Sequence, residues 1–352
     1  MQNRGALNPD HTQTAPSLSD FAEQGAVYAG LAKTLEEGTM VHAYLISGAD
    51  GTGKRTLASL IAQYLLCTGE KKPCGECPSC IQSLSGNHPD VIVVKPGEPV
   101  NPHVERNLKS IPVDEIRTVN EIVGQQTFTG GMRVILIQQA EKMTQQAQNA
   151  LLKTLEEPVD GTVFLLTTSA PALLLPTIIS RVRSVKLHPW PDAYVRKTLE
   201  KLGVEAVRAG NAVQVCGGSI GRAIEVAGDE AYWQRREEVM RDFLDLKGRS
   251  DILRVSTAWK DRKDASGELL DDLDDMLRTL MLVRLGQADA GLIASYPAPW
   301  QRMAREAGTE AIVSVMEAVR EARRLRINQV TWQAIIERLL LRLMEESSRW
   351  ST

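Results

Sequence analysis

The sequence predicts an α/β domain with a parallel sheet, followed by an all-helical C-terminal part. Up to about residue 190, short runs rich in β-branched residues alternate with helical patterns, which is typical of a parallel sheet covered by helices. Beyond that point we find no convincing strand, and the charge becomes denser, with 16 basic and 18 acidic residues in 1–190 against 25 and 26 in 191–352. All six Trp residues lie at or after Trp190. A domain boundary near residue 190 is therefore expected.

The expected elements follow in order along the chain. The strand candidates are 43–47, 91–94, 134–137 and 163–167. The helix candidates between them are 53–66, 113–123 and 144–155, and Pro158 closes the last because proline cannot continue a helix.

Near the C-terminus, the stretch 327–344 places large apolar residues three and four positions apart, as one buried helical face requires. These residues are Trp332, Ile335, Ile336, Leu339, Leu340 and Leu343. We interpret this face as a core stripe, with a partner-binding groove as the alternative.

Composition and charge exclude several classes of protein. With 352 residues, 43% of them hydrophobic, the chain is long enough for about two to three globular domains. The net charge of −3 does not favour a stand-alone nucleic-acid binder. The most apolar stretch, 162–179, contains Pro171 and Pro176, so no membrane partner is expected. The first 20 residues are polar and carry no targeting signal, which predicts a disordered tail over 1–18 and a cytoplasmic protein.

A glycine-rich loop, GADGTGKRT over 48–56, directly follows the first strand candidate and opens a helix candidate. Such a loop turns backbone N–H groups and a helix N-terminus toward phosphate oxygens, and a lysine adds positive charge. The candidate cofactor-binding residues of this degenerate phosphate loop are Gly48, Gly51, Gly53, Lys54 and Thr56. A glycine-rich turn without a ligand is the alternative.

The loop lacks the hydroxyl that should follow its lysine and hold magnesium. Arg55 stands there, and Thr56 comes one residue late, turned by about 100 degrees around a helix. The acidic pair expected after the hydrophobic strand is also missing, because Gln138 and Gln139 stand in its place and an amide cannot neutralise magnesium. Glu141 is expected to be a solvated residue at a helix start. We therefore expect no magnesium-dependent hydrolysis, and ATP binding is not favoured.

A cluster of cysteines predicts a structural zinc site in a loop rich in proline and glycine. Because disulfides are rare in cytosolic proteins, this spacing indicates tetrahedral zinc ligation by thiolates. The alternatives are four unrelated buried thiols, or His88 as a rival ligand, while Cys216 is expected to be an ordinary buried residue. The four metal ligands are Cys67, Cys74, Cys77 and Cys80.

From about Phe21 onward, the order of these features resembles the clamp-loader ATPase subunits of the AAA+ class, which belong to bacterial DNA polymerase III. Besides the four-cysteine insert, the residues that carry the resemblance are His42-Ala43-Tyr44-Leu45, His88-Pro89-Asp90, Val113-Asp114-Glu115-Ile116-Arg117, Asn149-Ala150-Leu151-Leu152-Lys153-Thr154-Leu155-Glu156-Glu157-Pro158 and Ser180-Arg181. The last two are the most specific. Beyond about residue 235, only helical character and position support the resemblance.

The resemblance implies a domain plan. The α/β P-loop (AAA+) domain with a parallel sheet would cover 19–187 and contain the zinc insert 67–80. A small helical lid would cover 188–231, and an all-α collar that mediates oligomerisation would cover 232–352.

The resemblance also implies roles for individual residues. Arg181 would act as an arginine finger in the ATP site of a neighbouring subunit, although Val182 replaces the Cys that follows the Arg in the family motif. Thr167 and Thr168 match the first nucleotide sensor, and Arg222 matches the second.

The implied function is a non-hydrolysing structural subunit of the bacterial clamp loader, part of the DNA polymerase III holoenzyme. Its partners would be the motor subunits and the delta subunit in a five-subunit ring, and through them the sliding clamp and primer-template DNA. No independent catalysis is expected, although the holoenzyme is a nucleotidyltransferase. The alternatives are an ATP-hydrolysing motor subunit and a zinc-ribbon nucleic-acid-binding module. Lys71 and Lys72 of the insert favour the second alternative, but the insert has no aromatic residue on which a base could stack.

Overall fold

The computed structural model describes residues 17–100, 109–260, 266–287, 293, 296–327 and 330–347. The chain forms two compact units. The first comprises residues 1–195 and 218–222, and the second comprises 196–217 and 223–352. Of the expected tail 1–18, residues 1–16 lie outside the described residues, and Leu18 begins the short 3-10 helix η1 (Leu18–Gln24).

A five-stranded parallel sheet organises the first unit, as the alternating pattern predicts. Its order is β2-β3-β4-β1-β5, and each neighbouring pair runs parallel. The strands are β1 (Ala43–Ser47), β2 (Val91–Val94), β3 (Arg133–Ile137), β4 (Thr162–Thr168) and β5 (Arg183–Lys186).

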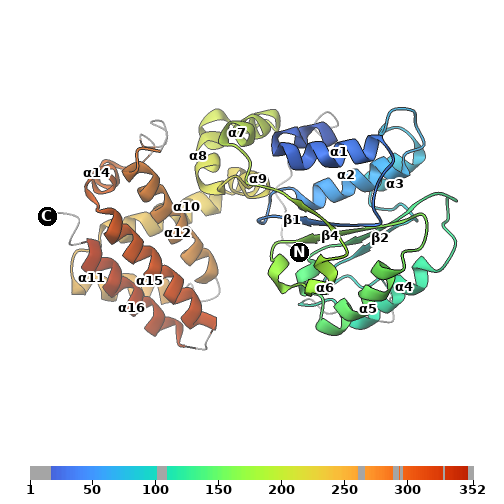
Figure 1. The fold of residues 1–352 in the computed structure, drawn as a ribbon. Coiled ribbons are helices and arrows are strands. Elements are labelled where there is room, and N and C mark those ends of the chain that lie inside the picture. Colours follow the sequence, from blue (N-terminus) through green and yellow to red (C-terminus); the bar gives the residue numbers. More distant parts are fainter. Residues whose placement is uncertain are drawn as a thin grey trace. The chain divides into compact units, whose positions relative to one another are not determined.

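Helices cover both faces of this sheet (Figure 1). On one face lie α1 (Ala26–Glu36), α2 (Lys54–Leu66) and α3 (Pro78–Leu84), and on the other lie α4 (Val113–Val123), α5 (Gln145–Glu156) and α6 (Pro176–Ile179). Side chains alternate across a strand, so Ile135 and Phe164 join α4 and α5 in one apolar core. Two more 3-10 helices, η2 (Ala140–Lys142) and η3 (Pro171–Leu173), shape the loops after β3 and β4.

The four strands expected from the sequence are all present, within one residue at each end. The fifth strand, β5, is not among the expected ones. Its residues Arg183, Ser184 and Lys186 are exposed, and Val185 alone is buried, so it lacks the apolar run by which a buried strand is recognised.

The second unit is helical throughout its described part, and no described residue after β5 belongs to a strand. Its core contains two fully buried tryptophans, Trp259 and Trp300, and an apolar face of the last helix. The helices after the sheet are α7 (Asp192–Lys201), α8 (Ala206–Cys216), α9 (Ile220–Gly228), α10 (Glu230–Leu244), α11 (Arg249–Lys260), α12 (Ser266–Arg284), α14 (Ala298–Glu306), α15 (Thr309–Ile327) and α16 (Trp332–Ser347). Among the described residues, none of the helices is long and apolar enough to cross a membrane.

The helix expected over 327–344 begins at Trp332, because α15 continues to Ile327. Its apolar stripe is core, since Ile335, Ile336 and Leu343 are buried against the rest of this unit. Cys216 is buried at the end of α8, as expected.

Candidate functional site

The residues expected to contact nucleotide gather at the carboxyl edge of the sheet. The phosphate loop follows β1, Gln138 and Gln139 follow β3, and Thr168 ends β4. Because β4 lies between β1 and β3 and all three run parallel, these ends are neighbours. Ligands of open α/β sheets bind at this edge. Thr167 and Thr168 are buried there.

Lys54 bends back over its own loop. The Lys54 Nζ donates to Gly48 O at 2.9 Å and Ala49 O at 2.8 Å, and it pairs with Asp50 Oδ1 at 3.3 Å. An ammonium group has three donors, so each donor has an acceptor within the loop. Of the two residues that follow, Arg55 is exposed and Thr56 is partly buried in the first turn of α2.

The segment 218–222 packs against Gly51 of the phosphate loop. The Gly221 N–H donates to Gly51 O at 2.9 Å. A Cβ at Gly51 would lie 2.0 Å from Ser219 Oγ, and Gly51 has a φ of +72°, so any other residue would displace Ser219 and strain the backbone. Arg222 follows directly, and its own N–H donates to Ser219 Oγ at 3.2 Å. The structure therefore brings the candidate sensor Arg222 to the phosphate loop.

Two further contacts close the loop. A Cβ at Gly48 would lie 2.9 Å from Leu187 O, so the chain after β5 packs directly on the first glycine. The indole Nε1 of Trp190 donates to Thr52 O at 2.9 Å, and both residues are buried. Neither contact is predictable from the sequence, because a tryptophan at a domain boundary does not indicate its partner.

The neutral amides Gln138 and Gln139 stand at the end of β3. The Gln138 N–H donates to Val94 O at 2.8 Å, so its backbone belongs to the sheet edge. Gln139 has a φ of 53°, and no other non-glycine residue in the described part of the chain has a positive φ. This conformation is uncommon for a residue with a side chain.

Glu141 lies at a helix start, in the first turn of η2, as expected, but it is only partly solvated. Its Oε1 accepts hydrogen bonds from the Ser169 N–H at 3.4 Å and the Ser169 hydroxyl at 2.9 Å, and its Oε2 is buried. Burial acts to raise the pKa of Glu141, but hydrogen bonds from its own N–H, Thr168 and Ser169 outweigh burial, and the pKa is lowered. The physical reason is the short helix η2, which turns directly after β3 and carries this carboxylate to the end of β4.

Arg181 lies at the opposite end of the strands, where β5 begins. It precedes β5, and the last residue of β5, Lys186, pairs with Ser47 beside the phosphate loop. A strand of four residues spans about 13 Å, so Arg181 is separated from its own phosphate loop by the length of β5. The Arg181 side chain is 34% exposed and forms an ion pair with Glu156 at 2.7 Å.

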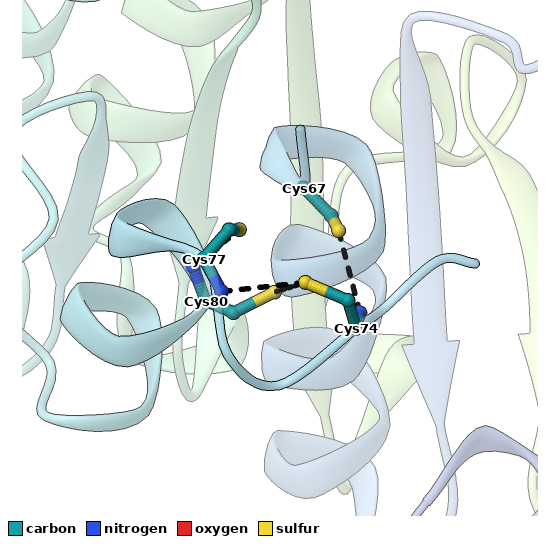
Figure 2. A group of neighbouring side chains, drawn as sticks. All are labelled: Cys67, Cys74, Cys77 and Cys80. Carbon is teal, nitrogen blue, oxygen red and sulfur yellow. Dashed lines mark hydrogen bonds between the residues drawn. The ribbon is translucent and has the colours of Figure 1, made fainter. Parts of the chain in front are cut away.

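The four cysteines of the insert converge at the ends of two helices (Figure 2). Cys67 ends α2, Cys77 caps the N-terminus of α3, and Cys80 lies in the first turn of α3. Cys74 lies in the loop between them, and its N–H donates to the Cys67 sulfur at 3.3 Å. Gly69 permits this approach, because a Cβ there would lie 2.9 Å from the Cys74 sulfur.

The donor set fits one metal ion. Thiolates around a tetrahedral zinc ion, each at about 2.3 Å, lie about 3.8 Å apart. The sulfur atoms of Cys74 and Cys80 are 3.9 Å apart, and all four sulfur atoms lie within 4.8 Å of one another. Backbone N–H groups of Thr68 and Cys80 lower the pKa of Cys77 to about 5, whereas burial raises the pKa of Cys80 to about 12. A bound cation would favour the thiolate form of both.

His88 does not join the four cysteines. It is buried, and its Nδ1 accepts the N–H of Asp90 at 3.1 Å. The fully buried Asp90 carboxylate accepts the N–H groups of Phe128 and Thr129 at 2.8 and 2.9 Å. The motif His88-Pro89-Asp90 therefore fixes the turn before β2 and the loop before β3.

Comparisons with known proteins agree with this architecture. The sequence profile of the family described as "DNA polymerase III, delta subunit" matches residues 23–191. A DNA polymerase III subunit delta' from Haemophilus influenzae is 41% identical over 156 residues, which cover 44% of this chain and 45% of that protein, so the match spans less than half of the relative. A subunit delta' from Bacillus subtilis is 27% identical over 321 residues, covering 90% of this chain and 94% of that protein.

Among solved structures, a DNA polymerase III gamma subunit-related protein from Thermotoga maritima is similar, with 19% identity and a TM-score of 0.47 over 91% of this chain and 99% of that one. The family profile covers the sheet, the phosphate loop and the cysteine insert, and the Bacillus match continues through the helical unit. The chain is thus similar to DNA polymerase III delta-prime subunits, in its sheet unit by the family profile and along most of its length by the Bacillus relative.

Proposed function

We propose that the chain is a non-hydrolysing structural subunit of the bacterial clamp loader, within the DNA polymerase III holoenzyme. In this role it contributes Arg181 as an arginine finger to the ATP site of a neighbouring subunit while the ring loads the sliding clamp on primed DNA. The observation that carries the proposal is the position of Arg181. The length of β5 separates it from Lys54 and its side chain is partly exposed, which supports a role at a site on another subunit rather than at its own.

The state of the chain's own nucleotide edge supports the absence of hydrolysis. Lys54 is bonded to the loop that should hold phosphate, and Gln138 and Gln139 offer no negative charge for magnesium. We therefore expect no independent catalysis, and Gly48, Gly51, Gly53, Lys54, Thr56 and Arg222 serve the packing of a vestigial loop.

We further propose that the cysteine cluster holds a structural zinc ion. Four protein thiolates fill a tetrahedral shell and leave no place for a substrate, as is typical of structural zinc sites. The proposed partners are the motor subunits and the delta subunit in a five-subunit ring, with the collar over 232–352 mediating assembly. The proposed lid covers 188–231.

The test is reconstitution of the complex with this chain and its Arg181→Ala variant. An arginine finger contributes roughly a thousandfold to the rate at the site that it serves. Because one of several sites would borrow this arginine, we expect a smaller loss in the whole ring, of roughly half or less of the clamp-stimulated ATP turnover. Arg181→Lys should not rescue fully, since an ammonium lacks the planar donor geometry.

The matched control is Arg117→Ala, which removes an exposed arginine of α4 that pairs with Asp114. This control should leave turnover and clamp loading unchanged. If Arg181→Ala assembles normally and the ring hydrolyses ATP and loads clamps at the unmodified rate, the proposed role of Arg181 is wrong. An ATPase activity of the purified chain alone would instead support the motor-subunit alternative.

A further inference from the structure

The stretch Leu155-Glu156-Glu157 belongs to one of the most specific motifs of the sequence, and none of the roles above accounts for its acidic pair. Glu156 pairs with Arg181, although the two residues are 25 positions apart in the chain. We propose that Glu156 is a positioning residue that holds the Arg181 guanidinium ready for the neighbouring ATP site. This inference rests on the proposed function of Arg181.

Three contacts orient the guanidinium. One terminal nitrogen, Nη2, lies 2.7 Å from Glu156 Oε1. The other, Nη1, donates to Thr177 O at 2.9 Å and approaches Ser180 Oγ at 3.3 Å. A guanidinium has five N–H donors in a rigid fork, so these contacts fix its plane and leave donors for a further acceptor. The two sides of the fork are held by different elements.

These elements are themselves tied together. Glu156 is the last residue of α5, whereas Thr177 and Ser180 belong to α6 and its C-cap. The α5 side chain Gln148 accepts the Leu175 N–H at 2.8 Å and donates to Leu173 O at 3.3 Å, just before α6. Because Gln148 is buried, these bonds fix the start of α6 against α5. The helix that carries Glu156 and the carbonyl of Thr177 are therefore held in place relative to each other before any partner arrives.

This orientation lowers the entropy that is lost when a neighbouring ATP site binds the Arg181 side chain. A free arginine side chain has many rotamers, and a partner that captures it must restrict them. A guanidinium already oriented by Glu156 avoids much of that loss of side-chain entropy. A group placed in advance stabilises the transition state without reorganising.

The chain offers a matched control at the next residue. Glu157 is exposed, and the hydrogen bond recorded for it in the described structure is that of its backbone N–H to Lys153 O. Glu156→Gln and Glu157→Gln therefore remove the same charge from adjacent positions, and only the first breaks the ion pair with Arg181.

The experiment uses the reconstituted complex with sliding clamp and primed DNA, and compares Glu156→Gln, Glu157→Gln, Arg181→Ala and the double variant of Glu156→Gln with Arg181→Ala. We expect Glu156→Gln to remove about half or more of the turnover that depends on Arg181, through a lower kcat at an unchanged KM for ATP. Glu157→Gln should match the unmodified complex. The double variant should match Arg181→Ala alone, because Glu156 acts only through Arg181.

Thermal unfolding and assembly should be the same in all four variants, which separates positioning from a loss of fold. If Arg181→Ala lowers turnover but Glu156→Gln leaves it unchanged or raises it, the positioning role of Glu156 is wrong, whereas the proposed arginine-finger role of Arg181 is retained. An additional loss in the double variant would also overturn it. If Arg181→Ala has no effect, the proposed function of Arg181 and this inference fall together.

Discussion

Lys54 illustrates how a single side chain decides what a phosphate loop does. Its ammonium lies in hydrogen-bond contact with Gly48 O and Ala49 O and pairs with Asp50, and its side chain is only 12% exposed. A phosphate could recruit this charge only by displacing three existing partners. Since hydrogen bonds to charged groups each contribute about 1.5–3 kcal/mol, the loop itself competes with any anion.

At the same scale, restoring the lost acidic pair should not restore hydrolysis. We expect the double variant of Gln138→Asp and Gln139→Glu to remain without magnesium-dependent ATPase activity, because Arg55 still occupies the hydroxyl position and Lys54 remains bonded to its loop. A phosphate-release assay on the purified double variant measures this. Turnover that appears in the double variant and disappears when Lys54→Ala is added would contradict the prediction.

At the scale of elements, the proposed zinc ion should stabilise the cysteine insert but not the sheet. We expect Cys77→Ser to lose the zinc ion and to open the insert 67–80 to proteases, while the rest of the chain stays folded, because the sheet has its own apolar core. Metal analysis and the position of the first proteolytic cut measure the effect.

The matched control for the insert is Cys216→Ala, which removes a buried thiol at the end of α8, outside the cluster. It should retain one zinc ion per chain and the unmodified cleavage pattern. Protein that is purified without chelator and contains no zinc would refute the metal assignment for the unmodified chain as well.

Which elements could be predicted depends on where their information lies. The helix Val113–Val123 and the strand Ala43–Ser47 carry their periodicity in consecutive residues, and both were predictable to the residue. The polarity of Glu141 did not indicate its environment, because Ser169, its partner, is 28 positions away. Gly51 was recognisable as part of a loop. The sequence did not show that Ser219 leaves no room for a side chain at this position, because only the fold brings Ser219 near. Glu156 belongs to a recognised motif, but its ion pair with Arg181 could not be predicted, because it depends on the contact between α5 and α6.

At the scale of the whole molecule, the helical unit buries charge in its core. Arg236 of α10 is 4% exposed and donates to Tyr232 Oη at 3.3 Å and to the hydroxyl of Tyr296. Tyr232 in turn donates to Asp275 of α12 at 3.2 Å. Asp272, one turn earlier on α12, is 2% exposed and has Arg235 Nε at 3.8 Å, beyond hydrogen-bond distance. A buried carboxylate with so weak a partner is costly when ionised.

This cost predicts how stability depends on pH. Burial raises the pKa of Asp272 to about 7, with Arg235 and Arg236 opposing the rise and Asp275 and Asp271 adding to it. Between about pH 4 and 7 the folded chain therefore holds a proton that the unfolded chain has lost, so the free energy of unfolding falls as the pH rises through this window. We expect Asp272→Asn to flatten that slope and to raise the melting temperature at pH 8, by about 2–4 °C for each kcal/mol regained.

Tryptophan fluorescence follows this transition well, because every tryptophan except Trp190 belongs to the second unit. Asp245→Asn, at the exposed C-cap of α10, is the control and should keep the slope of the unmodified chain. Equal slopes for Asp272→Asn and the unmodified chain would show that Asp272 does not titrate in this range.

The strand β5 affects how readily copies of this chain aggregate by pairing their strands. It is an edge strand, bonded to β1 on one side, and such an edge presents unpaired backbone groups to which another chain can add a strand. Arg183 and Lys186 project from it and are exposed, and the strand is only four residues long. Charged side chains on a short edge oppose strand addition and hence aggregation during synthesis and folding. The polarity that concealed β5 from sequence analysis is thus the property that protects the sheet from growing beyond it.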